Sequence, residues 1–242
     1  MRTVYASSWG PTVREAVRAT WPRTRRLDVE DNDNLSRILR YVLRGDGCGV
    51  DVGSHCGSVL SQMIAVAPNA QHHAFEPLPH LAARLRREFP NATVYECALS
   101  DESGSSTFHR AVQDEGYSGL RRRDYARPDE QVEILQVQTR RLDDLLPPDL
   151  RVDFCKIDVE GAELQVLRGA QRTLARWKPY VFFEHGVGSA NHYGTTPEMV
   201  HALMTEVGLA IFEPDGRGPL SVAELRSIFD ANTRWNFLAR PY

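Results

Sequence analysis

Hydrophobic side chains recur along most of the chain at the spacings of amphipathic helices and buried strands. Recurrence every three or four residues predicts helices over 31–43, 57–67, 79–89, 163–177, 197–207 and 222–229. Short apolar runs predict strands over 50–52, 72–75, 93–97, 132–137, 152–158, 180–183, 209–212 and 235–239. A helical turn is predicted at 142–146, and an Asp- and Asn-rich start can cap the first helix.

The predicted strands and helices alternate along the chain. Strands that are separated by helices pair in parallel through right-handed crossover connections. This order predicts an α/β fold, doubly wound, with helices on both faces of the sheet. No linker divides the sequence, so we expect a single domain over residues 31–242.

Residues 1–30 form an N-terminal arm in this interpretation. Val13, Ala16, Val17 and Trp21 have the spacing of the apolar stripe of an amphipathic helix. Packing against the core is the usual role of such a stripe. The alternatives are a lid over the active site and a contact between two copies of the chain, so a homo-oligomer stays open.

The polar segment 100–131 interrupts the alternation and predicts a hairpin with a long loop. Loops of that length in compact domains are usually functional or mobile. This one carries three consecutive arginines, Arg121 to Arg123. Because arginine binds acidic and phosphorylated groups well, a lid that selects such an acceptor is one interpretation, and a solvated run of charge is the commoner one.

Composition narrows the class of protein. The chain has 242 residues, of which 42% are hydrophobic, and its net charge is −3. This hydrophobic content excludes a disordered chain. The nearly neutral charge argues against a protein that binds the phosphate backbone of nucleic acids through a broad basic surface. Polar residues interrupt the uncharged stretch 52–75, and the N-terminus lacks an apolar leader, so we expect no membrane span and a cytoplasmic location. Four scattered cysteines favour neither disulfides nor a zinc site.

The strand ends carry the candidate chemistry, because ligands of open α/β sheets bind beyond the carboxyl ends of the strands. The first strand runs into DVGSHCG at residues 51–57. Glycines there let the backbone turn sharply and approach a ligand, and the following helix presents its N-terminal amides. The spacing is not G-x-G-x-x-G, which disfavours a dinucleotide-dependent dehydrogenase.

The second strand ends at Glu76, nineteen positions after Gly57. An acid at this place can accept hydrogen bonds from both ribose hydroxyls, and its charge would repel a ribose phosphate. The third strand leads to Ala98 and Leu99, small and apolar residues that can flank an adenine. Together these ends predict a cofactor that contains adenosine without phosphates.

These motifs, with KIDVEGAE at 156–163 and VLRGA at 166–170, resemble the FkbM-type branch of S-adenosylmethionine (SAM)-dependent methyltransferases. The resemblance runs from about residue 50 to about residue 184. It implies a class I methyltransferase-like, mostly parallel seven-stranded sheet with an antiparallel final strand. It also implies SAM as cofactor and, as acceptor, a hydroxyl of a sugar, polyketide or other secondary metabolite. His55 and Cys56 depart from the smaller or amide residues usual in the glycine loop.

The candidate cofactor-binding residues lie at these strand ends. They are Asp51, Gly53, Ser54, His55, Gly57, Glu76, Pro77, Ala98, Leu99 and Asp158.

Two further strand ends provide the candidate catalytic residues. Asp158 closes one strand, and its charge would be useful beside the sulfonium or the methionine amino group; Lys156, on the same face, is its expected ion-pair partner. Glu160 serves the same purpose or caps the following helix. His185 closes the next strand and is the preferred general base because imidazole titrates near neutral pH, with Glu184 orienting it or contacting substrate.

Several alternatives stay open. His185 can be a hydrogen-bonded structural histidine, and His55, His109 and His192 are further candidate bases. Asp158, Glu184 and His185 can also hold a divalent metal that positions two hydroxyls. The sequence thus predicts a SAM-dependent O-methyltransferase acting on a small molecule. A non-catalytic SAM-binding module and a nucleic-acid methyltransferase are the competing functions.

Overall fold

The computed structural model describes residues 21–125 and 127–242, and its main element is a seven-stranded sheet in the order β3-β2-β1-β7-β8-β10-β9. The strands are β1 (Gly49–Val52), β2 (His73–Phe75), β3 (Thr93–Tyr95), β7 (Phe154–Ile157), β8 (Tyr180–Glu184), β9 (Ala210–Phe212) and β10 (Asn236–Arg240). Pairing is parallel from β3 to β8, and β10 is antiparallel to both of its neighbours. The predicted doubly wound sheet with an antiparallel final strand is therefore confirmed.

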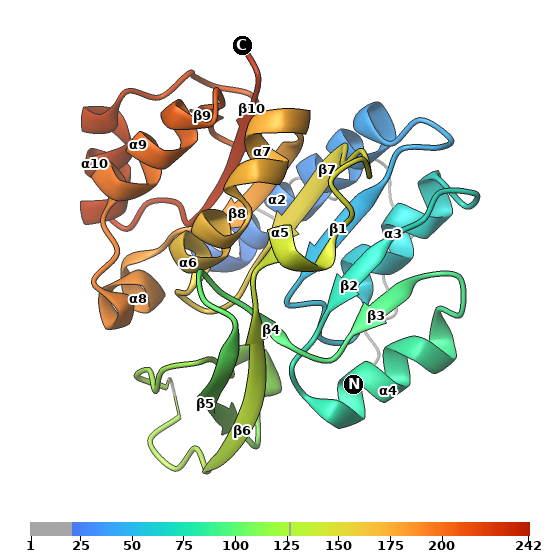
Figure 1. Ribbon diagram of the computed structural model, residues 1–242. Helices are drawn as coiled ribbons and strands as arrows, with labels where there is room; N and C mark the ends of the chain where they lie inside the picture. Colours follow the sequence, from blue (N-terminus) through green and yellow to red (C-terminus); the bar gives the residue numbers. More distant parts are fainter. Residues whose placement is uncertain (1–20, 126) are drawn as a thin grey trace.

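Helices cover both faces of this sheet (Figure 1). One face carries α2 (Arg23–Val42), α3 (Ser58–Val66) and α4 (Pro79–Glu88). The other carries α5 (Leu142–Leu145), α6 (Glu163–Gly169), α7 (Gln171–Trp177), α9 (Pro197–Glu206) and α10 (Val222–Asp230). The short helix α8 (Val187–Ala190) and the 3-10 turns η1 (Glu115–Tyr117) and η2 (Asn191–Tyr193) lie in loops.

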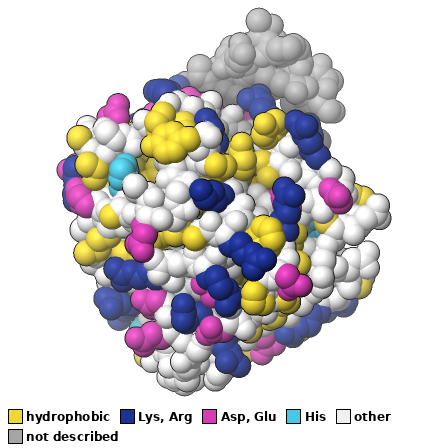
Figure 2. All heavy atoms as spheres, turned by 45° about the horizontal axis from the view of Figure 1, so that its top comes forward, with side chains coloured by type: hydrophobic (Ala, Val, Ile, Leu, Met, Phe, Trp, Pro, Cys, Tyr) yellow, Lys and Arg dark blue, Asp and Glu magenta, His cyan; other side chains and the backbone are white. Residues whose placement is uncertain are grey.

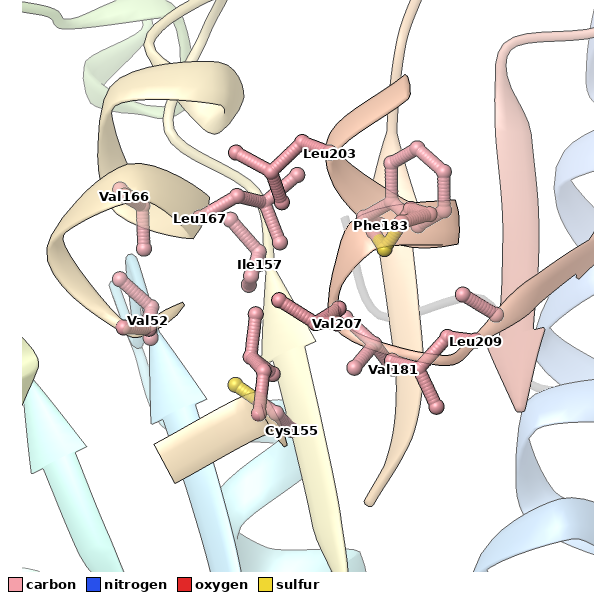
Figure 3. Packing of buried hydrophobic residues seen from close by; sticks show 14 of the residues in the cluster. Val52, Cys155, Ile157, Val166, Leu167, Val181, Phe183, Leu203, Val207 and Leu209 are labelled. Atoms are coloured by element: carbon pink, nitrogen blue, oxygen red, sulfur yellow. The ribbon is translucent and has the colours of Figure 1, made fainter. Parts of the chain in front are cut away.

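The largest hydrophobic cluster lies between the sheet and the second group of helices. Figure 3 shows Val52, Ile157 and Phe183 of the strands directed toward this layer, where Leu167 and Leu203 meet them. All five are nearly or fully buried. Because side chains alternate along a strand, the residues between them point to the opposite face.

That opposite face carries the charged residues of the central strands. Asp51 pairs with Lys156 in register across β1 and β7, and Lys156 pairs with Phe182 of β8. Glu184 follows Phe182 by two positions and therefore shares its side of the sheet. The sheet thus separates a hydrophobic layer from a layer in which charges collect beside the strand ends.

A second, three-stranded sheet extends below the main one in the view of Figure 1. It contains β4 (Ala98–Leu99), β5 (Gly104–Ala111) and β6 (Val132–Arg140), in the order β4-β6-β5. The hairpin predicted within 100–131 is corrected: that segment contributes one long strand, and β6 is its antiparallel partner. The remainder, 112–131, connects the two.

Two helix predictions also need correction. The first helix begins at Arg23 instead of residue 31, directly after Pro22, and its early turns are mostly polar and exposed, so hydrophobic spacing gave no signal. The helix expected over 163–177 is divided at Ala170 into α6 and α7. A Cβ on Gly169 would lie 2.1 Å from the Ser100 carbonyl oxygen. The backbone at Ser100 therefore passes too close to Gly169 to leave room for a side chain.

The described surface is mixed in character. Figure 2 shows the face at the top of Figure 1, where basic side chains are interspersed with acidic, hydrophobic and uncharged ones. Within residues 21–125 and 127–242, no helix is both long enough and apolar enough to cross a bilayer. Residues 1–20, with most of the predicted apolar stripe, lie outside the described residues.

Candidate active site

Two adjoining cavities lie at the carboxyl ends of the parallel strands. The first cavity is lined by the ends of β1 and β2, by β4 and by the start of the 112–125 loop. The second cavity has a volume of about 740 Å³. It lies between the ends of β7 and β8, the glycine turn at residues 53–57, the 112–125 loop and the first turns of α2. Both cavities are lined by Gly53, His55, Gly116, Asp158 and Glu160. These five residues form the junction of the two cavities.

The predicted cofactor residues divide between the two cavities. Those that line the first cavity are Gly53, His55, Glu76, Pro77, Ala98, Leu99 and Asp158. Asp51 and Ser54 line the second cavity. Gly57 lines neither; a Cβ there would lie 2.5 Å from the ring of Phe89, so its role in this structure is the close packing of α3 against α4.

Position 53 of this turn requires a glycine. Its φ is +76°, in the left-handed region that favours glycine, and an added Cβ would lie 1.9 Å from the carbonyl oxygen of Asp158. The amides of Gly53 and Ser54 donate to the Phe75 carbonyl at 3.0 and 3.1 Å. The turn is therefore pressed against β2 and β7, and its backbone is exposed to a ligand without an intervening side chain.

Glu76 is held rigidly in the first cavity. Its carboxylate accepts the amide of His55 at 2.8 Å and the amide of Leu78 at 2.9 Å, one on each oxygen. The side chain is only 4% exposed, and burial raises its pKa to about 7. Each oxygen keeps a lone pair for a further donor, so the carboxylate can accept two hydroxyls of a ligand.

Several charged side chains surround Asp158 at the junction of the two cavities. Lys156 Nζ donates to its carboxylate at 2.8 Å, and the carboxylates of Asp158, Glu160 and Glu184 lie within 4.8 Å of one another. The lysine holds the pKa of Asp158 below its usual range. Burial, together with the charge of Asp158, raises the pKa of Glu184 well above its usual value. The side chains of Glu184 and Asp158 share a hydrogen bond, which the raised pKa of Glu184 favours.

The arginines of the 112–125 loop are engaged within the protein. Arg123 forms an ion pair with Glu160 and lies over the ring of Tyr117, 4.8 Å from its centroid. The Arg121 amide donates to the Tyr193 hydroxyl at 2.9 Å, and its guanidinium donates to the carbonyl of His192 at 2.8 Å. These contacts hold the loop across both cavities and occupy two of the three arginines.

Glu163 is a positioning residue that the sequence interpretation missed. It is 1% exposed, and one of its oxygens accepts the amides of Val159 and Gly161 at 3.1 and 3.0 Å. Glu160 and Gly161 have positive φ values of 58° and 108°. The turn after β7 is thus fixed by Glu163, while Glu160 faces Arg123. An acid three residues after the turn was the available signal.

His185 does not reach either cavity. Its ring is fully buried and stacks on Phe229 of α10, with the centroids 4.9 Å apart. Neither ring nitrogen has a hydrogen-bond partner, and burial lowers its pKa to about 4. The physical reason is alternation along β8, which turns Glu184 toward the cavity and His185 toward the hydrophobic layer. The structure therefore gives no geometric support to His185 as base.

The predicted metal set is likewise not brought together. With His185 on the other side of β8, the group that the described residues assemble is Asp158, Glu160 and Glu184. Two of these carboxylates already have cationic partners, Lys156 and Arg123. A divalent ion would have to compete with both.

Among the other candidate bases, only His55 lines a cavity. His109 lies in β5, where its backbone pairs with Gly119. His192 contributes its carbonyl to the Arg121 contact. His55 lines both cavities and has a left-handed φ of 46°.

We expect His185→Leu to leave turnover unchanged. The leucine removes two unpartnered ring nitrogens from the core, so unfolding at neutral pH should cost about 1 kcal/mol more, or the same. Since the pKa of His185 is depressed in the folded state, the wild-type protein loses stability as the pH falls from about 6.5 toward 4. The variant should lose less, as urea unfolding at several pH values would show. A strong loss of turnover with intact folding would contradict this placement.

The comparison with known families agrees with this geometry. The profile of the methyltransferase FkbM domain matches residues 51–208, a range that includes the glycine turn, Glu76, the turn after β7 and β8. The chain belongs to the FkbM methyltransferase family.

Curated relatives of this FkbM-family chain include two methyltransferases. The 2-O-methyltransferase NoeI of Sinorhizobium fredii is 28% identical over 164 residues, which cover 62% of this chain and 67% of NoeI. Methyltransferase 1 of Beauveria bassiana is 32% identical over 141 residues, which cover 50% of this chain and 57% of that protein. The chain thus spans little more than half of the second relative's length.

Among solved structures, the FkbM methyltransferase of Methylobacillus flagellatus aligns over 81% of this chain and 44% of its own. The sequences are 15% identical in that alignment and the TM-score is 0.49.

Proposed function

We propose that this FkbM-family chain is a SAM-dependent O-methyltransferase that acts on a hydroxyl of a small molecule. The observation that carries the proposal is that the two cavities meet at Asp158. The first cavity contains Glu76, a carboxylate that can accept ribose hydroxyls, and it adjoins the larger, polar second cavity. Family membership supports methyl transfer, and the name of NoeI, a 2-O-methyltransferase, supports oxygen as the acceptor atom.

The lining of the first cavity suits the adenosine part of SAM, and its free volume of about 60 Å³ would have to widen to admit it. Glu76 can accept the ribose hydroxyls, and Ala98 and Leu99 provide apolar contacts for the adenine. Gly53 lines both cavities and carries no side chain, so the rest of the cofactor can pass along its backbone. When bound, SAM supplies an electrophilic methyl group on a positively charged sulfur.

Asp158 and its partners suit the charge at the junction. Lys156 keeps Asp158 ionised, so a carboxylate faces the place where the sulfonium would lie. Glu184 hydrogen-bonds Asp158 and so orients that carboxylate. We propose Asp158 and Glu184 as residues that position the reacting groups, an effect that contributes about 7–11 kcal/mol when two reactants are well aligned.

The second cavity fits a small polar acceptor. Its volume, about 740 Å³, is within the range of about 300–1,000 Å³ that is usual for small-molecule sites. Its lining combines carboxylates, hydroxyls and the aromatic rings of Tyr117 and Trp235. Rings with adjacent polar groups suit an acceptor that has both apolar faces and hydroxyls, such as a sugar or a glycosylated secondary metabolite.

The affinity for SAM should depend on pH through Glu76. Its pKa of about 7 means that the carboxylate, which accepts both hydroxyls, is lost as the pH falls. Affinity should therefore decrease about tenfold from about pH 8 to about pH 6, in proportion to the ionised fraction. Calorimetric titrations across this range measure the effect. The Glu76→Gln variant, which does not titrate, should show a smaller dependence; equal slopes would contradict the assignment.

The proposed activity can be tested directly. The protein is incubated with SAM and a panel of glycosylated and polyketide compounds, with and without EDTA, and the products are analysed by mass spectrometry. We expect the mass of one added methylene, located on oxygen by fragmentation. Methylation on nitrogen or carbon would contradict the proposed chemistry. Tight SAM binding without any product would instead favour the non-catalytic binding module.

A further inference from the structure

We infer that the imidazole of His55 accepts the proton of the acceptor hydroxyl during methyl transfer. This inference rests on the proposed function. It also replaces His185, whose ring lies in the core.

Of the five residues that line both cavities, one has a side chain suited to act as a base. Gly53 and Gly116 have no side chain. Asp158 is paired with Lys156 and Glu160 with Arg123, so both carboxylates are held by cations. The imidazole of His55 makes no hydrogen bond within the described residues, and imidazole is the side chain that ordinarily exchanges a proton near neutral pH.

The backbone fixes where this imidazole is presented. His55 has a φ of 46°, a left-handed conformation that is uncommon for a residue with a side chain and is found preferentially at functional sites. Its amide donates to Glu76 at 2.8 Å. The residue that contacts the proposed ribose carboxylate therefore also lines the second cavity, so the proposed base is tied to the proposed cofactor position.

Charged side chains surround this imidazole. The acids that line the second cavity with His55 are Asp28, Asp51, Asp114, Asp158, Glu160 and Glu184, and the bases are Lys156 and Arg123. Glu76 and Glu115 line the first cavity. Lys156 and Arg123 are each paired with an acid. The acids outnumber the bases around this imidazole.

The proton transfer completes the balance of the reaction. As the acceptor oxygen forms its bond to the methyl carbon, the carbon–sulfur bond breaks and its electron pair stays on sulfur. The hydroxyl proton passes to a ring nitrogen of His55. The neutral methyl ether and S-adenosylhomocysteine (SAH) leave, and the imidazolium then gives its proton to solvent.

The first test compares His55→Asn with wild type on the acceptor found in the panel. Asparagine tolerates the left-handed backbone but cannot accept the proton. We expect SAH affinity within about threefold of wild type, and kcat lower by about 10²–10⁴-fold, the usual contribution of a general base. At saturating SAM, added imidazole should restore part of the rate.

The matched control is His201→Asn, a half-buried histidine of α9 that lines neither cavity and whose ring contacts the Leu220 carbonyl. Its kcat should equal that of wild type. A His55→Asn variant with wild-type kcat overturns the inference. So does a variant whose only defect is weaker SAH binding, since His55 would then be a cofactor-binding residue.

A second readout needs no acceptor. In a crystal structure of the protein with SAH, we expect the imidazole to face the second cavity beside the sulfur, with a ring nitrogen open to solvent. An imidazole hydrogen-bonded to the carboxylate or amino group of SAH overturns the inference. A wild-type protein that binds neither SAM nor SAH instead overturns the proposed function, so the two failures are distinguishable.

Discussion

Replacing Glu76 by alanine should lower the affinity for SAM by at least about 100-fold. In the proposed binding mode the carboxylate accepts two ribose hydroxyls, and hydrogen bonds to a charged group contribute about 1.5–3 kcal/mol each. Because the side chain is buried, water cannot readily replace it. Calorimetric titration with SAM measures the loss.

Folding has to be measured alongside binding, since Glu76 also accepts the amides of His55 and Leu78. Thermal unfolding of the variant should show a native fold of reduced stability. Glu88→Ala is the matched control, because Glu88 is an exposed acid on α4 that forms an ion pair with Arg84; the variant should bind SAM as wild type does. A folded Glu76→Ala protein that binds SAM within threefold of wild type would show that the ribose lies elsewhere.

The second large effect is expected at Gly53. A Cβ there would lie 1.9 Å from the Asp158 carbonyl oxygen, which is backbone and cannot rotate away, and the φ of +76° is itself unfavourable for alanine. We expect Gly53→Ala to lower the free energy of unfolding by at least about 3 kcal/mol, through strain and overpacking together. SAM binding should be lost as the turn moves away from β7.

The Gly45→Ala variant separates the cost of backbone strain from the cost of overpacking. Gly45 has a similar φ of +82°, but no atom lies within 4 Å of an added Cβ. Only the backbone strain remains, about 1–2 kcal/mol, and SAM binding should be retained. Equal stability of the two variants in urea unfolding would mean that the turn is not pressed against β7 as described.

The sequence predicted the sheet well because its signals are local. Apolar runs and helical spacing identify the strands and helices, and their alternation implies parallel pairing. The smaller sheet was missed because it depends on long-range pairing: β4 has only two residues, and β5 and β6 are separated by a connection of twenty residues. Neither feature has a local signature.

The candidate site was predictable to the extent that it depends on strand ends. Gly53, Glu76 and Asp158 follow three different strands, and the structure brings all three to the first cavity, although their roles toward a ligand stay predictions. The choice between Glu184 and His185 was not predictable in the same way. It depends on which residue of β8 faces Phe229, a contact between segments far apart in sequence.

Titration calorimetry of the unmodified protein with SAM and, separately, with NADH tests whether the first cavity binds an adenosyl sulfonium donor. We expect saturable binding of one SAM per chain and no binding of NADH. A flat titration with SAM, or saturable binding of the pyrophosphate-bearing nucleotide in its place, would contradict it.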